Sequence, residues 1–241
     1  MRLAVISDIH ANLEALREVL RDIEAVGADR VVSLGDNIGY GPEPQAVVEL
    51  MKELGIPSVM GNHELALVNP RYGARFNPSA RLSLEITRGL LSEESLASLF
   101  ALKHSMVSGE CLCVHGFPPH SAVTYLFEVS DETLRKNLTT MKQDICFVGH
   151  THELGLATVD GSHLDRKNLS QGPIRLKEGI RHLVNVGSVG QPRDGDNRAK
   201  YVLWNDESRI LDVRFVPYDI ERTARKIIEL GFPSINATRL R

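Results

Sequence analysis

The stretch LAVISDIH at residues 3–10 is a short apolar run that stops at two side chains able to bind a metal, Asp8 and His10. Such runs are typical of buried strands. Four more runs end in the same way: RVVSLG before Asp36, PSVMG before Asn62 and His63, CLCV before His115, and ICFVG before His150 and His152. Because ligands of open α/β sheets bind beyond the carboxyl ends of the strands, these five ends are expected to converge. Their residue types predict a metal site.

The first sixty residues alternate between strand and helix patterns. We expect strands at 2–7, 30–34 and 57–60, and helices at 11–26 and about 44–54. Glycines follow the two helical patterns, as is common at helix ends. A β-α-β-α-β order predicts a parallel sheet with helices packed on its faces.

Helical periodicity then dominates from 65 to 103. Ser92, followed by two glutamates, has the pattern of a helix N-cap. We expect a helical insertion beside the site, with a loop-like segment that carries Asn69, Arg71, Tyr72 and Arg75.

The second half of the chain is rich in short strand patterns separated by turns. We expect strands at 104–108, 111–114, 145–149, 154–159, 181–186, 200–204 and 209–216, and a closing helix at about 219–230. These strands are sufficient for a second sheet. The expected fold class is therefore α/β, or α+β.

Composition sets limits on the class of protein. The 241 residues are 42% hydrophobic and 24% charged with a formal net charge of -3, which is typical of a globular protein. We expect one domain over residues 1–241. The weak negative charge argues against binding to anionic membranes or extended nucleic acid, which usually requires a basic surface.

The N-terminus does not resemble a signal peptide, because Asp8 and His10 interrupt its apolar run. No segment approaches the roughly 18 apolar residues of a membrane helix. We therefore expect a cytoplasmic protein. Cys111 and Cys113 could form a zinc site with Cys146, but a fourth ligand is missing, so core positions in strands are the favoured interpretation.

The metal-capable residues include the ligand types of a two-metal hydrolytic site, which needs a bridging carboxylate and imidazoles for each ion. Asp8 and His10 can bind one ion together, and His150 and His152 supply further imidazoles from another strand end. Asp36, in the segment GDNIGYG, is the natural bridge. The glycines around it permit the sharp turn that keeps it at the strand end.

These segments resemble the calcineurin-like metallophosphoesterase superfamily, and in particular its small stand-alone prokaryotic branch. The family blocks D-x-H, G-D-x-x, G-N-H-[DE], a lone histidine and G-H-x-H occur here in order. They are Asp8 and His10, Gly35 and Asp36, Gly61 to Glu64, His115, and Gly149 to His152. Ala11 and Glu64 depart from the residues usual in the family, and neither change removes a ligand. The resemblance implies a four-layer αββα sandwich of two mixed β-sheets flanked by helices.

The resemblance also implies a role for each matching residue. One ion would be bound by Asp8, His10 and His152, and the other by Asn62, His115 and His150. Asp36 would bridge the two ions. His63 would bind neither and would instead polarise or protonate the ester.

The chemistry expected of such a site is phosphoester hydrolysis. Two ions about 3.5 to 4 Å apart share a water and lower its pKa, so that a bridging hydroxide can attack phosphorus in line near neutral pH. The departing alkoxide needs a proton. The imidazole of His63, with an unperturbed pKa of about 6.5, is suited to supply it.

Other polar residues have simpler interpretations. Asn12 and Asn37 are expected to be turn formers or helix caps. The segment NVGSVGQPRDGD at 185–196 reads as a connection after a sixth strand, and we expect its Arg193 to contact a substrate phosphate. His104, His120, His163 and His182 are assigned surface or structural roles.

We thus expect a dinuclear phosphoesterase acting on mono- or diesters, with a diester or small nucleotide favoured. Mn²⁺, Fe, Ni²⁺, Zn²⁺ and Co²⁺ all suit the ligand set, and Mn²⁺ is favoured. The alternative is a non-catalytic metal-binding scaffold or interaction module with this fold. A nuclease for polymeric substrates is disfavoured by an aromatic fraction of 5% and the lack of basic runs. The sequence leaves the substrate and the oligomeric state open.

Overall fold

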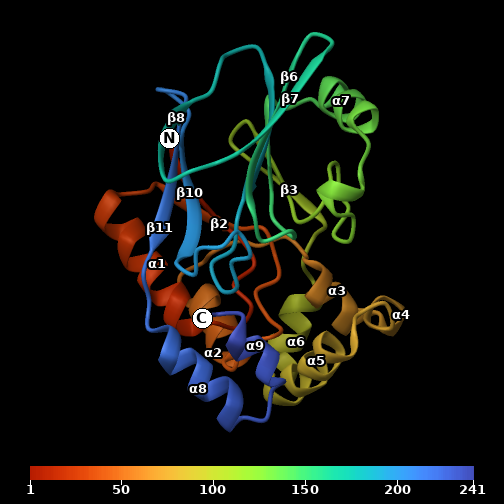
Figure 1. Ribbon diagram of the computed structural model, residues 1–241, viewed down its shortest axis with the longest axis vertical. Coiled ribbons are helices and arrows are strands. Elements are labelled where there is room, and N and C mark those ends of the chain that lie inside the picture. The colour runs from red at the N-terminus through yellow and green to blue at the C-terminus, as the bar shows by residue number, and fades with distance from the viewer.

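A computed structural model describes all residues from 1 to 241, and its core is two β-sheets packed face to face (Figure 1). The first sheet has the order β2-β1-β10-β11-β8. Its strands are β1 (Arg2–Ile6), β2 (Arg30–Ser33), β8 (Gly172–Arg175), β10 (Ala199–Asn205) and β11 (Ile210–Val216). Only the β1–β2 pair is parallel, so the sheet is mixed.

The second sheet has the order β3-β4-β5-β9-β6-β7. Its strands are β3 (Ser105–Ser108), β4 (Cys111–Val114), β5 (Ile145–Val148), β6 (Leu154–Asp160), β7 (His163–Asn168) and β9 (Arg181–Val186). Strands β4, β5 and β9 run parallel and the other pairs are antiparallel. In both sheets, the parallel strands therefore end at one edge.

Helices lie on the outer faces of both sheets and beside the strand ends. They are α1 (Leu13–Val26), α2 (Pro44–Glu53), α3 (Asn62–Val68), α4 (Pro70–Gly73), α5 (Pro78–Leu90), α6 (Glu93–Phe100), α7 (Asp131–Thr140), α8 (Ile220–Glu229) and α9 (Ser234–Thr238), with a 3-10 turn η1 (Leu126–Glu128). Helices α1 and α2 pack on the first sheet and α7 on the second. The expected four-layer αββα sandwich of two mixed sheets is confirmed. None of the helices combines the length and apolar composition needed to span a bilayer.

Alternating side chains along each strand contribute to two different parts of the core, one between the sheets and one between a sheet and its helices. In β1, Leu3 and Val5 face the layer between the sheets, whereas Ala4 and Ile6 face α1 and α2. Successive strand residues point to opposite faces, so a strand buried on both sides reads as one apolar run. This burial explains why the strand ends could be recognised in the sequence.

The structure corrects several details of the expected elements. Residues 57–60 form only two isolated bridges rather than a strand, from Ser58 to Ser33 of β2 and from Val59 to Lys103. Pro57 has no N–H to extend the pairing with β2. The segment that carries Arg71 and Tyr72 is the short helix α4 rather than a loop. Strands β7 and β8 and helices α7 and α9 were not expected.

The three cysteines are free and buried in the core. Cys111 and Cys113 face the layer between the sheets, and Cys146 packs in the cluster under α7. They therefore point to different sides of the second sheet. This arrangement confirms the core interpretation over a zinc site.

The helical insertion is confirmed and begins at Asn62, slightly earlier than expected. Helices α3 to α6 form a lobe beside the strand ends, on the right of Figure 1. Their shared core includes Leu67, Leu84 and Leu96. The lobe places the first turn of α3, with Asn62 and His63, next to the ends of both sheets.

Candidate metal centre

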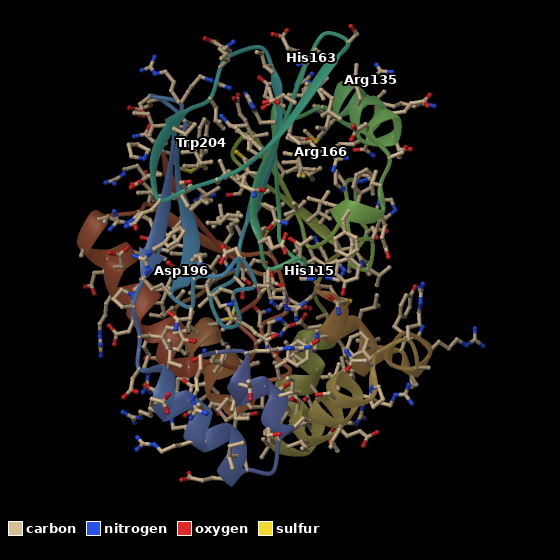
Figure 2. The ribbon with its side chains drawn as sticks, viewed as in Figure 1. His115, Arg135, His163, Arg166, Asp196 and Trp204 are labelled. Carbon is tan, nitrogen blue, oxygen red and sulfur yellow. The ribbon has the colours of Figure 1, made fainter.

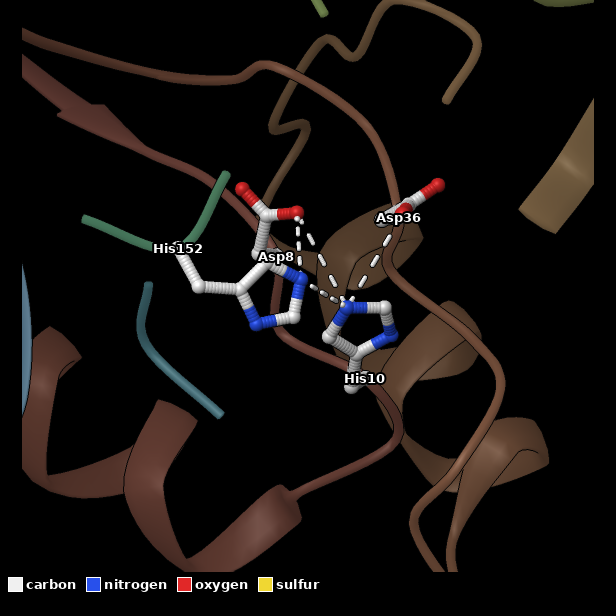
Figure 3. A group of neighbouring side chains, drawn as sticks. All are labelled: Asp8, His10, Asp36 and His152. Carbon is white, nitrogen blue, oxygen red and sulfur yellow. Dashed lines mark hydrogen bonds and ion pairs between the residues drawn. The ribbon is translucent and has the colours of Figure 1, made fainter. Parts of the chain in front are cut away.

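The predicted ligands meet beyond the carboxyl ends of β1, β2, β4 and β5, where Figure 2 places His115. One group consists of Asp8, His10, Asp36 and His152, which Figure 3 shows turned toward one another. The two Nε2 atoms of His10 and His152 are 3.0 Å apart. His152 Nε2 is 3.3 Å from Asp8 Oδ1.

A second group forms around His115 on the other side of Asp36. His115 Nε2 is 3.3 Å from Asp36 Oδ2, 3.1 Å from His150 Nδ1 and 3.0 Å from Asn62 Oδ1. Asp36 Oδ2 also lies 3.8 Å from His10 Nε2 in the first group. One carboxylate oxygen thus stands between the two groups.

Backbone carbonyls orient three of the imidazoles. His10 Nδ1 donates to the oxygen of Ile38 at 3.1 Å, and His115 Nδ1 donates to Leu34 at 2.9 Å. His152 Nδ1 donates to the oxygen of Gln191 at 2.6 Å. A carbonyl only accepts, so Nδ1 carries the hydrogen and Nε2 turns toward the cluster. This is the arrangement that a metal-binding histidine requires.

The backbone of the site is strained. Five of the seven predicted ligands have positive φ: Asp8 (53°), His10 (48°), Asp36 (52°), His150 (71°) and His152 (63°). Non-glycine residues adopt this left-handed region infrequently, and each costs roughly 1–3 kcal/mol. Such strain clusters at functional sites, where surrounding bonds over-determine the conformation.

Glu64 fixes the two loops that carry Asp36 and His63. Its carboxylate accepts the backbone N–H groups of Asp36 and Gly61, each at 2.9 Å, and of Asn37 at 2.8 Å. Asp36 Oδ1 in turn accepts the N–H of His63 at 2.8 Å. This leaves Asp36 Oδ2 for the cluster. Sequence reasoning noted Glu64 only as a departure from the family pattern and missed this role.

Asp8 is oriented in a similar way. Its Oδ2 accepts Ser7 Oγ at 2.6 Å and the backbone N–H of His150 at 3.0 Å. Its Oδ1 faces His152 and has no hydrogen-bond partner although it is buried. The loop after β5 is therefore tied directly to the loop after β1.

The end of β9 and the segment after it support both loops from behind. Asn185 Nδ2 donates to the oxygen of Gly149 at 2.9 Å, and Ser188 Oγ donates to the oxygen of Asp8 at 2.8 Å. Gly190 packs so closely that an added Cβ would lie 1.8 Å from the oxygen of Ile9. This segment was expected to be a plain connection, but it is a structural support of the site.

Gly190→Ala is expected to lower the free energy of unfolding by about 3 kcal/mol, at the upper end of overpacking effects, because the methyl group would overlap the backbone of Ile9 and press on the Asn12 side chain. Gly89→Ala is the matched control. Gly89 is in α5 and nothing lies within 4 Å of its added Cβ, so it should be neutral or stabilise by up to about 1 kcal/mol. Urea unfolding of both variants measures the difference. If the two variants have equal free energies of unfolding, the backbone around Gly190 can move to accept a methyl group and the close packing is not required.

The electrostatics of the site are dominated by burial. Burial lowers the pKa of His10 and His152 well below the ordinary value and that of His150 to about 3, so these rings are neutral near pH 7. Burial likewise raises the pKa of Asp8 to about 6. For His115, burial alone would lower the pKa, but the Asp36 carboxylate outweighs it and raises the pKa to about 9. Positive charge is thus strongly favoured beside Asp36.

His63 lies next to the cluster but belongs to neither group. Its Nε2 is 4.0 Å from Asp36 Oδ2. Its ring is held between Tyr40 and Phe76, with centroid distances of 4.6 and 4.8 Å. Burial lowers its pKa to about 4. Phe76 comes from the helical lobe, which therefore forms one wall of the site.

The chemistry of these residues fits divalent ions. Neutral His10 and His152 both carry their hydrogen on Nδ1, so two Nε2 lone pairs face each other at 3.0 Å, an arrangement that a cation between them relieves. Two atoms each about 2.1 Å from one ion are about 3.0 Å apart at a right angle and about 3.4 Å apart at the tetrahedral angle. Five of the distances between ligand atoms, 3.0 to 3.3 Å, lie in this range, whereas His10 Nε2 is 3.8 Å from both Asp8 Oδ1 and Asp36 Oδ2. Buried charges are normally paired or coordinate metals, and no lysine or arginine pairs with Asp8 or Asp36.

All seven predicted ligands and His63 are thus brought together, and Arg193 lies at the edge of the site. Arg193 is exposed, its Cζ is 5.9 Å from the Tyr40 ring centroid, and its Nη2 donates to Gln191 Oε1. The sequence did not indicate the aromatic rings beside the histidines, which are Tyr40 and Phe76 next to His63 and Tyr125 stacked on His150. These rings follow no spacing rule, and only the fold places them beside the histidines.

Two mixed sheets between helices, with Asp and His residues gathered at the strand ends, define a metallophosphoesterase fold. The chain belongs to the calcineurin-like phosphoesterase superfamily, because the model of that superfamily domain matches residues 1–208. An uncharacterized protein from Methanocaldococcus jannaschii is 34% identical over 99% of this chain and 96% of its own length.

Solved structures agree with this assignment. A metallophosphoesterase from Sphaerobacter thermophilus is 36% identical and superposes with a TM-score of 0.85, covering 100% of this chain and 98% of its own. A hypothetical protein from Pyrococcus horikoshii OT3 has a TM-score of 0.81 at 18% identity, over 99% and 97% of the two chains. The second similarity shows the fold alone.

Proposed function

We propose that the protein is a dinuclear metal-dependent hydrolase of phosphate mono- or diesters. The observation that carries this proposal is the position of Asp36 Oδ2 between two groups of ligands, with the imidazole of His63 beside them and outside both. A shared carboxylate is the feature of two-metal sites that activate water.

In this proposal each group of residues binds one ion. Asp8, His10 and His152 would bind the first, and Asn62, His115 and His150 the second, with Asp36 common to both. The bound ions would supply Lewis acidity that polarises the phosphoryl group and lowers the pKa of water. The nitrogen-rich set suits Mn²⁺, Fe, Ni²⁺, Zn²⁺ or Co²⁺, and we favour Mn²⁺.

His63 is proposed to act on the ester oxygens. With its pKa lowered to about 4, the ring is neutral near pH 7 and offers one N–H. In this form it can donate a hydrogen bond to a phosphoryl oxygen and polarise the ester. A phosphate anion bound beside it favours the protonated ring, which can then give its proton to the leaving alkoxide.

Arg193 is proposed to bind the substrate phosphate from the open side of the site. Its guanidinium matches the geometry of phosphate oxygens. The bond to Gln191 and the contact with the Tyr40 ring hold it near the cluster. We favour a diester or a small nucleotide as substrate.

The proposed function is tested by removing and restoring the ions. Protein stripped by a chelator and reloaded with each metal in turn is assayed with a generic monoester, a generic diester and a panel of cyclic nucleotides and dinucleotides. We expect turnover only after reloading, and most with Mn²⁺. If all reloaded forms remain inactive on the whole panel while still binding two ions, the protein is a metal-binding scaffold instead.

We also propose that residues 1–241 form one domain that works in the cytoplasm. The C-terminal helices lie beyond the part matched by the family model, yet they pack against the rest. Thr223 donates to Asn12 Oδ1 at 3.0 Å, and Asn236 Nδ2 donates to the oxygen of Tyr40 at 3.0 Å. These bonds brace the loops of the site, which supports a single cooperative unit.

A further inference from the structure

Three aromatic rings stack in series from the candidate metal centre outward. The Tyr125 ring lies parallel to the imidazole of His150, with a centroid distance of 3.7 Å and an interplanar angle of 14°. The Phe127 ring lies parallel to Tyr125 at 4.8 Å and 16°. Phe127 is 72% exposed. The exposed Phe127 ring is thus separated from the predicted ligand His150 by one intervening ring, that of Tyr125.

The turn that carries these rings is fixed rather than loose. Arg166 of β7, labelled in Figure 2, donates to the oxygens of Leu126 and Val129 at 3.4 and 3.2 Å. Its guanidinium also pairs with Asp131 at 2.8 Å, at the start of α7. Bonds at both ends of η1 therefore fix the position of Phe127, as expected of a pre-organised binding surface.

A cavity of about 230 Å³ lies against Phe127. It extends to Thr151, the residue between His150 and His152. Its wall combines Phe127 and aliphatic side chains with polar groups, among them the exposed Lys167 and Asn168. Sites for whole drug-sized ligands have roughly 300–1,000 Å³, so this cavity suits one ring system of a larger molecule.

We propose that Phe127 and this cavity form a subsite for the base of a nucleotide whose phosphoester lies at the metal centre. The base would stack on the Phe127 ring, and polar groups of the wall would meet its edge. Base–aromatic stacking tolerates any base because each has a π-face. This inference rests on the proposed function and specifies its substrate class as nucleotides rather than sugar or alkyl phosphates.

The test compares AMP with ribose 5-phosphate, which carries the same primary phosphoester without a base. Calorimetry gives the dissociation constants for the Mn²⁺-loaded protein, and kcat/KM is measured in parallel. Stacking is worth about 1–3 kcal/mol per base, so we expect AMP to bind about 5- to 150-fold more tightly. Phe127→Leu should reduce this ratio to near one, whereas Phe127→Tyr, which keeps the ring, should retain it.

Phe100→Leu is the matched control, because Phe100 is an exposed phenylalanine of α6 outside this cavity. The subsite is wrong if the wild-type protein binds AMP and ribose 5-phosphate equally tightly. It is also wrong if Phe127→Leu keeps the preference for AMP to the same extent as Phe100→Leu. If both compounds are hydrolysed with equal efficiency, the subsite is wrong and the proposed function stands. If AMP binding depends on Phe127 but no phosphoester is cleaved, the subsite stands and the proposed function fails.

Discussion

Asp36→Asn is expected to reduce the bound metal from two ions to one or none and to lower kcat/KM by about three orders of magnitude or more. Asn has almost the same shape but carries no charge, and its NH₂ group cannot bind an ion from the position of Oδ2. The loss of Lewis acid stabilisation is worth several kcal/mol, and about 1.4 kcal/mol corresponds to a factor of ten. Metal content by mass spectrometry and steady-state kinetics measure the two effects.

Asp160→Asn is the control for the same substitution at a carboxylate far from the site. Asp160 is exposed at the end of β6, so both metal content and turnover should stay at the wild-type level. An Asp36→Asn protein that retains two ions and full turnover would remove the shared carboxylate from the mechanism. Thermal unfolding of both variants shows whether a loss of folded protein contributes to any decrease in metal content or turnover.

His63→Gln is expected to lower kcat by about 10²- to 10⁴-fold, the range typical of a proton donor or acceptor, while two ions remain bound. The reason is geometric, because His63 lies in neither group of ligands and its ring is supported by Tyr40 and Phe76. Kinetics and metal content measured on the same preparation show whether His63 acts in catalysis or binds an ion.

His163→Gln serves as the control, because His163 is exposed at the far end of the β6–β7 hairpin (Figure 2). If His63→Gln loses an ion, then His63 is a ligand and the division of roles is wrong. If it keeps both ions and full kcat with every substrate tested, another group moves the proton.

The buried layers of the fold could be predicted from the sequence, because a strand covered on both faces leaves a continuous apolar run. Strands β4 and β5, CLCV and ICFV, are fully buried examples. Strand β7, HLDRKN, is mostly exposed and polar, so it has no such pattern and was missed. The prediction of a strand at 57–60 was wrong because the apolar run after Pro57 resembles a strand, whereas it forms only isolated bridges.

The composition of the candidate site was predictable, but the way it is held was not. The ligand types stand at strand ends in a recognisable order, and the fold brings all of them together. Positive φ at Asp8 and His150 could not be predicted, because even Asp and His adopt it infrequently and the surrounding structure must hold it. The same holds for the bonds of Glu64 to the distant Asp36 loop, which depend on the folded chain. Such contacts are invisible in spacing or composition.

The positions of the bound ions test the dinuclear centre most directly. A crystal of the Mn²⁺-loaded protein, measured at the manganese absorption edge, shows each ion as an anomalous peak. We predict two peaks about 3.5 to 4 Å apart, both within bonding distance of Asp36, with His63 bound to neither. A single peak, or two ions that do not share Asp36, would contradict the dinuclear centre.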